Sequence, residues 1–310
     1  MFTACAGTAD LRSPRPITGD DRFRIASVTK TYLAAVVLQL VAEQRLTLSD
    51  TLGHRLPGLV PGGDRITVED LLRMRSGLPD YVMAVLGDPP DLGRLQRYFP
   101  PEELIATALA LPDRRPPGQG WRYSNTDYVL LGLVVEAATG LSVPELFQRR
   151  IFDPLKLTST SMPTRDLHIE GPHPRGYLRQ DAASGYVDST EFTPSESWAA
   201  GAIISTPPEV VCFLEGLLGG RLLPPPQLAS MRTMQPARGD MSYGMGLFSY
   251  RLADGTLLSG HGGSHFGVAC YAFRSGQGRT VVLYQTSWDR VTRGIPPRNA
   301  FVQAAFSALR

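Results

Sequence analysis

Apolar side chains recur three or four positions apart over much of the first two thirds of the chain. In 27–44 this spacing predicts a helix that begins at Ser27, with an apolar face made of Leu33, Val36, Val37, Leu40 and Val41. The strongly apolar segment 126–139 predicts a second long helix, which ends at Gly140. Similar patterns predict shorter helices over 68–74, 102–111, 143–150, 208–218 and 226–234.

The pattern changes in the last quarter of the chain. Strands joined by short turns are predicted over 243–251, 256–260, 267–273 and 280–285. The segment 2–11 alternates weakly and is also predicted as a strand, 299–309 as a closing helix, and the polar segment 163–197 has no assignment. A helix-rich middle followed by a run of antiparallel strands predicts an α+β fold.

Composition narrows the class of protein. The chain has 310 residues, 43% of them hydrophobic, which is enough for one large domain or two closely packed ones. The net charge is +2 and no basic block stands out, so we expect no nucleic-acid partner. Three scattered cysteines without a C-x-x-C pattern predict neither a disulfide framework nor a zinc cluster, and we expect no metal and no cofactor.

No targeting or membrane segment stands out. The first ten residues lack a basic stretch followed by a long apolar one, and the longest apolar runs are too short to span a bilayer. The sequence as written therefore predicts a cytoplasmic protein, with export as the alternative if the natural chain begins upstream. Its oligomeric state has no signal in the sequence.

Lysine and asparagine are rare in this chain. Of its 31 basic side chains only Lys30 and Lys156 are lysines, and Asn125 and Asn299 are the only asparagines. In a chain that uses arginine almost throughout, each of these residues suggests a local chemical need.

The first candidate motif is Ser27-Val28-Thr29-Lys30, an S-x-x-K tetrad at a helix start. Residues three apart share a helix face, so the Ser27 hydroxyl and the Lys30 amine can meet. A serine hydroxyl is a poor nucleophile until a base takes its proton. Lysine can be that base if burial lowers its pKa. Taken alone, the tetrad also fits a surface lysine one turn into a helix.

The second motif, Tyr123-Ser124-Asn125, lies just before the apolar helix at 126. A tyrosine there can shuttle a proton between the nucleophile and the leaving group. Asn125 can hydrogen-bond both a lysine and a substrate amide. The alternative is an ordinary helix N-cap.

The third motif is His261-Gly262-Gly263-Ser264, at the end of the strand predicted over 256–260. A strand without side chains at two successive positions lets a substrate backbone pair along it, and its amides can face an oxyanion. The alternative is a glycine-rich turn. His261 and His265 are four apart, but two glycines lie between them and no zinc site is expected.

In this order and at these spacings, the motifs resemble those of the penicillin-recognising serine hydrolases, the superfamily of penicillin-binding proteins and class C β-lactamases. Further similar segments, which extend the resemblance over nearly the whole chain, are 23–26, 71–78, 117–118, 200–206 and 243–246. The resemblance implies an antiparallel sheet flanked by helices and an all-helical second lobe. It implies one β-lactamase-like catalytic domain over 1–310, with an α/β lobe at about 1–50 and 240–310 and a helical lobe at about 51–239.

The resemblance also implies a mechanism. Ser27 attacks a carbonyl and forms an acyl-enzyme, while Lys30 and Tyr123 move the proton. The backbone N–H groups of Ser27 and Ser264 form the oxyanion hole, and His261 lines the cleft and supports the ionisation state of Tyr123. The residues implied to contact the substrate are Asn125, Gly262, Gly263 and Ser264.

The sequence departs from the family pattern in two places. Class C β-lactamases carry Lys-Thr-Gly where this chain has His261-Gly262-Gly263. That change favours the D-alanyl-D-alanine carboxypeptidase, esterase, D-amino-acid amidase and peptide-cyclising branches over β-lactam hydrolysis. Only 26 residues precede Ser27, so we expect the usual N-terminal helix and first strand to be absent, or the natural start to lie upstream.

Three hypotheses about function follow from these observations. The leading one is a serine hydrolase that acts through an acyl-enzyme on a small ester, or on an amide or peptide ending in a D-amino acid. The second is an acyltransferase, peptide cyclase or β-lactamase of the same fold. The third is a non-catalytic penicillin-binding or sensor module, which the intact Ser27, Lys30, Tyr123 and Asn125 oppose.

Overall fold

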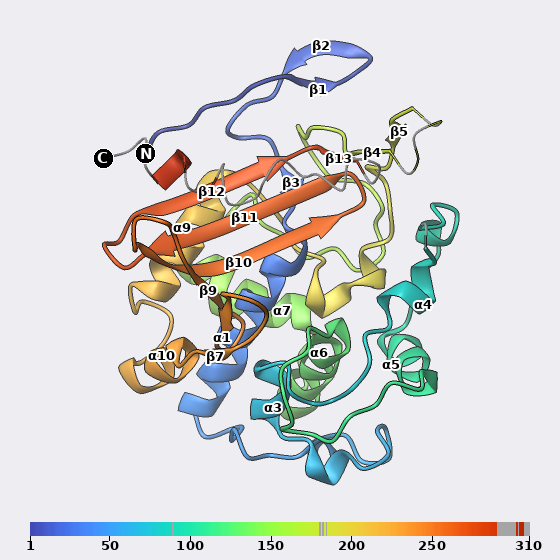
Figure 1. The fold of residues 1–310 in the computed structure, drawn as a ribbon, viewed down its shortest axis with the longest axis vertical. Coiled ribbons are helices and arrows are strands. Elements are labelled where there is room, and N and C mark those ends of the chain that lie inside the picture. Colours follow the sequence, from blue (N-terminus) through green and yellow to red (C-terminus); the bar gives the residue numbers. More distant parts are fainter. Residues whose placement is uncertain are drawn as a thin grey trace.

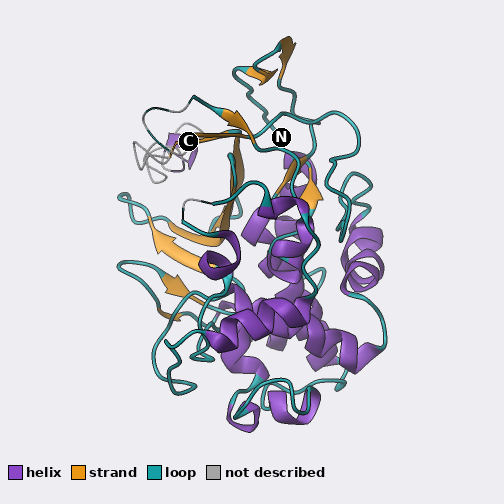
Figure 2. Cartoon of the chain, turned by 90° about the vertical axis from the view of Figure 1, so that its right-hand side faces the viewer, coloured by secondary structure: helices purple, strands orange, loops and turns teal. Residues whose placement is uncertain are grey.

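A computed structural model describes residues 1–88, 90–179, 181, 183, 185–289, 302 and 304–306. Its main sheet has six antiparallel strands in the order β12-β11-β10-β9-β8-β7. These strands are β7 (Gln235–Pro236), β8 (Ser242–Tyr243), β9 (Phe248–Arg251), β10 (Leu257–His265), β11 (Val268–Ser275) and β12 (Thr280–Gln285). Figures 1 and 2 show the sheet on one side of the molecule, with most helices gathered below and behind it.

The helices come mainly from the middle of the chain. They are α1 (Thr29–Ala42), α2 (Leu52–Arg55), α3 (Val68–Leu72), α4 (Val82–Leu86), α5 (Pro101–Ala110), α6 (Asn125–Thr139), α7 (Val143–Phe147), α8 (Asp153–Leu155), α9 (Pro207–Leu218) and α10 (Pro225–Arg232). Helix α9 packs on β11 and β12, whereas α3 and α5 pack on α6. No single helix among the described ranges has the length and apolar character needed to cross a bilayer. Helix α6 and the following segment Val143–Leu155 pass the test only when taken together, and the chain bends by 78° between them.

Helix α1 is the central helix of the molecule. Every residue from Thr29 to Leu38 is buried, on all sides of the helix. The helix contacts α6, α7 and α10, and a short 3-10 turn, η1 (Ala26–Val28), joins its N-terminus to β10 and β11. The sequence predicted only one apolar face, but a helix that is apolar nearly all round can be buried completely. Lys30 in the first turn is therefore carried into the core.

The first 25 residues form no helix and add no strand to the main sheet. Strand β1 (Thr8–Asp10) pairs with β2 (Ser13–Pro16) in a separate hairpin, and β3 (Phe23–Arg24) pairs with β6 (Ile204–Ser205). The strand predicted over 2–11 is thus confirmed only for its last residues.

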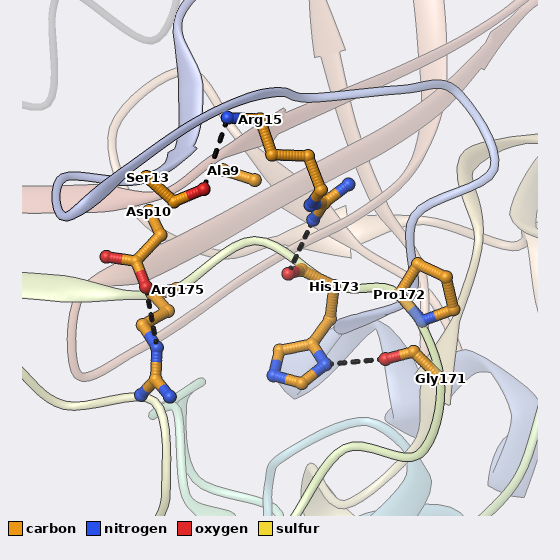
Figure 3. Close-up of a pocket in the computed structure, with 8 residues that line it drawn as sticks. All are labelled: Ala9, Asp10, Ser13, Arg15, Gly171, Pro172, His173 and Arg175. Atoms are coloured by element: carbon orange, nitrogen blue, oxygen red, sulfur yellow. Dashed lines mark hydrogen bonds and ion pairs between the residues drawn. The ribbon is translucent and has the colours of Figure 1, made fainter.

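The hairpin borders a polar groove. Arg15 donates to the His173 carbonyl over 2.8 Å, and Arg175 pairs with Asp10 at 3.3 Å (Figure 3). None of the residues that line this groove belongs to the three motifs.

Most predicted elements are confirmed with shifted ends. The strand predicted over 243–251 is two strands, β8 and β9, separated by a turn in which Gly246 has a φ of +74°. The helix predicted over 143–150 leaves α-helical geometry after Phe147 and continues as a π-turn, η4 (Gln148–Phe152). The closing helix predicted over 299–309 lies largely outside the described residues, as does Asn299, although 302 and 304–306 are helical.

Strand β10 differs most from its prediction. It was expected to end at Gly260 but runs on to His265, so the whole His261–Ser264 motif lies inside a strand. The alternative of a glycine-rich turn at this motif is therefore wrong. Two smaller strand pairings complete the described fold, with β4 (Tyr177–Arg179) between β5 (Val187–Asp188) and β13 (Ser287–Asp289).

Candidate active site

Ser27 lies in η1, immediately before α1. Its flanking residues Ala26 and Val28 are buried, whereas Ser27 itself is partly exposed. Ala26 has a φ of +49°, a left-handed conformation that side-chain-bearing residues adopt rarely and that often marks functional turns. Thr31 donates to the Gly246 carbonyl over 2.7 Å and holds the start of α1 in place. Ser27, the candidate nucleophile, thus stands at the N-terminal end of a buried helix.

Lys30 is completely buried and makes three hydrogen bonds through its amine. Nζ lies 3.0 Å from Ser27 Oγ, 2.7 Å from Asn125 Oδ1 and 2.7 Å from the Ala200 carbonyl oxygen. An ammonium has three protons to donate, so the three acceptors match its capacity. The S-x-x-K interpretation is supported over the surface-lysine alternative because Lys30 is 0% exposed and touches Ser27.

Burial also changes how readily Lys30 gives up its proton. Burial lowers the pKa of Lys30 to about 7, while the negative charges of Asp80 and Glu196 act in the opposite direction. Near neutral pH a substantial fraction of Lys30 is therefore an amine, whose lone pair can take the proton of Ser27.

This pKa sets an expected pH dependence. If the neutral amine is the active form, kcat/KM should rise with pH below about 7 and level off above it, because Lys30 loses its proton across that range. A pH–rate profile between pH 5 and 9 measures this limb. A kcat/KM that is flat from pH 5 to 9 would contradict the assignment of Lys30 as base.

Tyr123 stands across the nucleophile from the loop before α6. Its ring centroid is 5.1 Å from Lys30 Nζ, and its hydroxyl is close enough to the Ser27 side chain to influence the pKa of the phenol. Burial raises the pKa of Tyr123 well above its usual value, although the Ser27 side chain opposes the shift. Tyr123 is therefore a protonated phenol at neutral pH, suited to relaying a proton rather than removing one as a phenolate.

Asn125 connects the lysine to an acidic residue that the sequence analysis did not single out. Its Oδ1 accepts from Lys30, and its Nδ2 donates to Asp80 Oδ2 over 2.9 Å. These two bonds fix which end of the amide faces the lysine and leave one Nδ2 proton for a substrate. Burial raises the pKa of Asp80, with the Lys30 charge and hydrogen bonds opposing the shift.

His261 lies on β10 and is completely buried. Nδ1 is 2.6 Å from the Gly262 carbonyl oxygen, which can only accept, so Nδ1 carries the proton in the neutral ring. Burial and the Lys30 charge lower the pKa of His261 to about 3, so the imidazole is neutral near pH 7. Nε2 is then an acceptor, and it has no partner among the described residues. The His261 ring centroid lies 6.4 Å from that of Tyr123.

The two glycines of the motif face opposite sides of β10. A methyl group added to Gly263 would lie 2.6 Å from both the Ser27 nitrogen and the Ile25 oxygen. Only glycine lets the strand approach the nucleophile's backbone this closely. A side chain at Gly262 would instead meet the Tyr271 ring at 3.1 Å, on the other face of the strand.

The close approach at Gly263 predicts a strong effect of one methyl group. Gly263→Ala should separate β10 from η1, lowering kcat/KM by about 10²-fold through a misplaced nucleophile. It should also destabilise the fold by about 1–3 kcal/mol, because backbone atoms cannot move aside as a flexible side chain can. Steady-state kinetics and urea unfolding measure both. Gly276→Ala, where the added methyl meets nothing within 4 Å, is the matched control. Equal behaviour of the two variants would refute the packing argument.

The C-terminal half of β10 has one edge that no described strand pairs with. β9 pairs only with Leu257–Gly260, and no other described strand covers that side of His261–His265. Ser264 is exposed there. An extended substrate could pair with this edge, as the glycine-rich motif predicted.

The structure thus brings Ser27, Lys30, Tyr123 and Asn125 into one cluster, with Gly263 against the backbone of Ser27 and His261 beside the tyrosine. A profile described as Beta-lactamase matches residues 1–304. The chain belongs to the beta-lactamase family.

Relatives of this chain carry several names. A D-aminopeptidase of Cereibacter sphaeroides is 27% identical over 290 residues, covering 89% of this chain and 52% of that protein. Esterase EstB of Burkholderia gladioli is 29% identical over 222 residues, covering 65% and 56%. The chain therefore spans about half the length of these curated relatives. Among solved structures, a D-amino acid amidase from Ochrobactrum anthropi has a TM-score of 0.87 at 28% identity, over 98% of this chain and 89% of that one.

Proposed function

We propose that this chain is a serine hydrolase that acts through an acyl-enzyme on an amide or ester of a D-amino acid. The observation that carries the proposal is the buried amine of Lys30, 3.0 Å from Ser27 Oγ and without any exposed surface. The names of the relatives, an aminopeptidase, an amidase and an esterase, support a substrate with an amide or ester bond.

The acylation step follows from the hydrogen bonds. Neutral Lys30 takes the Ser27 proton, directly or through Tyr123, as Oγ bonds to the substrate carbonyl carbon. The backbone N–H groups of Ser27 and Ser264 are proposed to hold the resulting oxyanion, each typically worth about 3 kcal/mol. The proton then passes through Tyr123 to the leaving nitrogen or oxygen as its bond to the carbonyl carbon breaks. The product is an ester on Ser27.

Deacylation reverses the roles. Water gives a proton to the Lys30–Tyr123 pair and attacks the ester, and Ser27 recovers its proton as the acid leaves. The neutral ring of His261, whose centroid lies 6.4 Å from that of Tyr123, lines the site beside the phenol. If an amine takes the place of water, the same site performs acyl transfer, the alternative that the sequence left open.

The site combines three distant parts of the chain, so we propose that 1–310 work as one catalytic domain. Ser27 comes from η1 and Lys30 from the first turn of α1. Tyr123 lies just before α6, Asn125 is the first residue of α6, and His261 comes from β10. No one of these segments holds a working set of groups by itself.

The test is a panel of matched substrates. Amides and p-nitrophenyl esters of D- and L-phenylalanine and D- and L-alanine would be compared by kcat/KM, with nitrocefin as the β-lactam probe. We expect preference for the D-enantiomers and slow or no nitrocefin turnover, because neutral His261 replaces the lysine of β-lactamases. Preference for L-enantiomers would overturn the substrate proposal, and adduct formation without turnover would favour the sensor hypothesis.

A further inference from the structure

A buried acid–histidine pair lies behind Lys30, outside the three motifs. Glu196 ends the short 3-10 turn η5 (Pro194–Glu196) and is 2% exposed. His265, the last residue of β10, has Nδ1 3.1 Å from Glu196 Oε1 and Nε2 3.2 Å from the Gly201 carbonyl oxygen. The Glu196 Oε1 atom makes no hydrogen bond with a described residue, so its approach to His265 is a close packing contact without hydrogen-bond alignment. The histidine thus touches both ends of the segment 196–201.

That segment supplies one of the three acceptors of Lys30. The Ala200 carbonyl, one residue before the Gly201 carbonyl that His265 contacts, accepts from Nζ over 2.7 Å. Trp198 has a φ of +36°, an unfavourable backbone conformation that its surroundings must hold. A methyl group on Gly201 would lie 3.1 Å from His265 Nε2, so the segment is packed closely against the histidine. Movement of His265 would therefore displace the Ala200 carbonyl.

The charge of Glu196 also reaches the lysine. Three charged or titratable groups lie near this carboxylate: His265 from β10, Arg24 from β3 and Lys30 from α1. Tyr81 donates its hydroxyl proton to the backbone carbonyl of Glu196 over 2.8 Å. Charges act strongly on one another in a buried, weakly polarisable site. Glu196 favours the protonated form of Lys30 and so opposes the effect of burial.

We infer that Glu196 and His265 are positioning residues for Lys30. Together they hold the Ala200 carbonyl against the amine, and the Glu196 carboxylate sets how readily that amine gives up its proton. The role in turnover rests on the proposed function, but the effect on the proton affinity of Lys30 does not.

The small number of lysines makes this directly measurable. With ¹³C-labelled lysine side chains the protein should give two titrating signals, from Lys30 and Lys156, and Lys156→Arg assigns them. Glu196→Gln keeps the shape of the side chain but removes its charge. We expect the Lys30 midpoint, and with it the acid limb of kcat/KM, to move down by about half a pH unit or more. Glu215→Gln, on an exposed position of α9, should leave both unchanged.

A second variant tests the positioning of the carbonyl. His265→Gln retains a polar side chain but cannot reproduce both ring contacts, and we expect kcat to fall about 10-fold with KM nearly unchanged. If Glu196→Gln does not fold, this variant decides the question alone. A folded Glu196→Gln with an unshifted Lys30 signal, or a folded His265→Gln with wild-type kcat, would overturn the inference. If Lys30 titrates as described but no substrate is turned over, the proposed function fails while the pairing stands.

Discussion

Replacing Lys30 by methionine is expected to lower kcat/KM by about 10³- to 10⁴-fold, because Ser27 then has no base within hydrogen-bonding distance. Methionine fills much of the buried lysine volume without a charge, so the fold should survive. Lys30→Arg should lose nearly as much activity, since an arginine keeps its charge and cannot accept a proton. Steady-state kinetics with an ester substrate, together with circular dichroism, measure the effect.

The matched control is the other lysine of the chain. Lys156→Arg changes an exposed residue that follows α8 and should leave kcat/KM within twofold of wild type. An active Lys30→Arg would show that the lysine acts through its charge and not through proton transfer.

Replacing Tyr123 by phenylalanine should lower kcat by about 10²- to 10³-fold with little effect on folding. The ring would keep its contacts with Trp121 and Phe248, and only the hydroxyl near Ser27 would be lost. The loss should be largest for amides, because a poor leaving group depends most on a delivered proton. Parallel kcat measurements on an amide and on a p-nitrophenyl ester of the same acid test this.

Tyr186→Phe, at an exposed tyrosine, serves as the control. If Tyr123→Phe retains more than a third of wild-type kcat on the amide, proton delivery does not pass through this hydroxyl. Equal losses on the amide and the ester would assign Tyr123 a positioning role instead.

The chemistry-bearing side chains could be found in the sequence because their types are unusual for this chain. Lys30 and Asn125 stand out against an arginine-rich, asparagine-poor background, and both lie within 2.7 Å of each other through Nζ and Oδ1. Tyr123 was found through its spacing from Asn125. Each of these side chains can be recognised from its residue type or its spacing in the sequence, and the fold then brings them together.

The backbone carbonyl and the two acidic residues of the site do not stand out in this way, because neither their residue type nor their spacing is unusual for this chain. The Ala200 carbonyl is a backbone group that any residue could provide, and its role depends on how segment 196–201 folds against β10. Asp80 and Glu196 are two of 29 acidic residues, and only tertiary packing places them beside Lys30. Strand β10 was predicted too short because glycines disfavour strands unless close packing requires them, as at Gly263.

The central claim, that Ser27 becomes acylated, is tested most directly by intact-mass spectrometry. The protein would be incubated with an activated p-nitrophenyl ester and, separately, with a fluorescent penicillin, and quenched at short times. We predict a mass increase of one acyl group per chain that is absent in Ser27→Ala and maps to the peptide containing Ser27. The absence of an adduct with both probes, or an adduct that persists in a folded Ser27→Ala, would contradict the account.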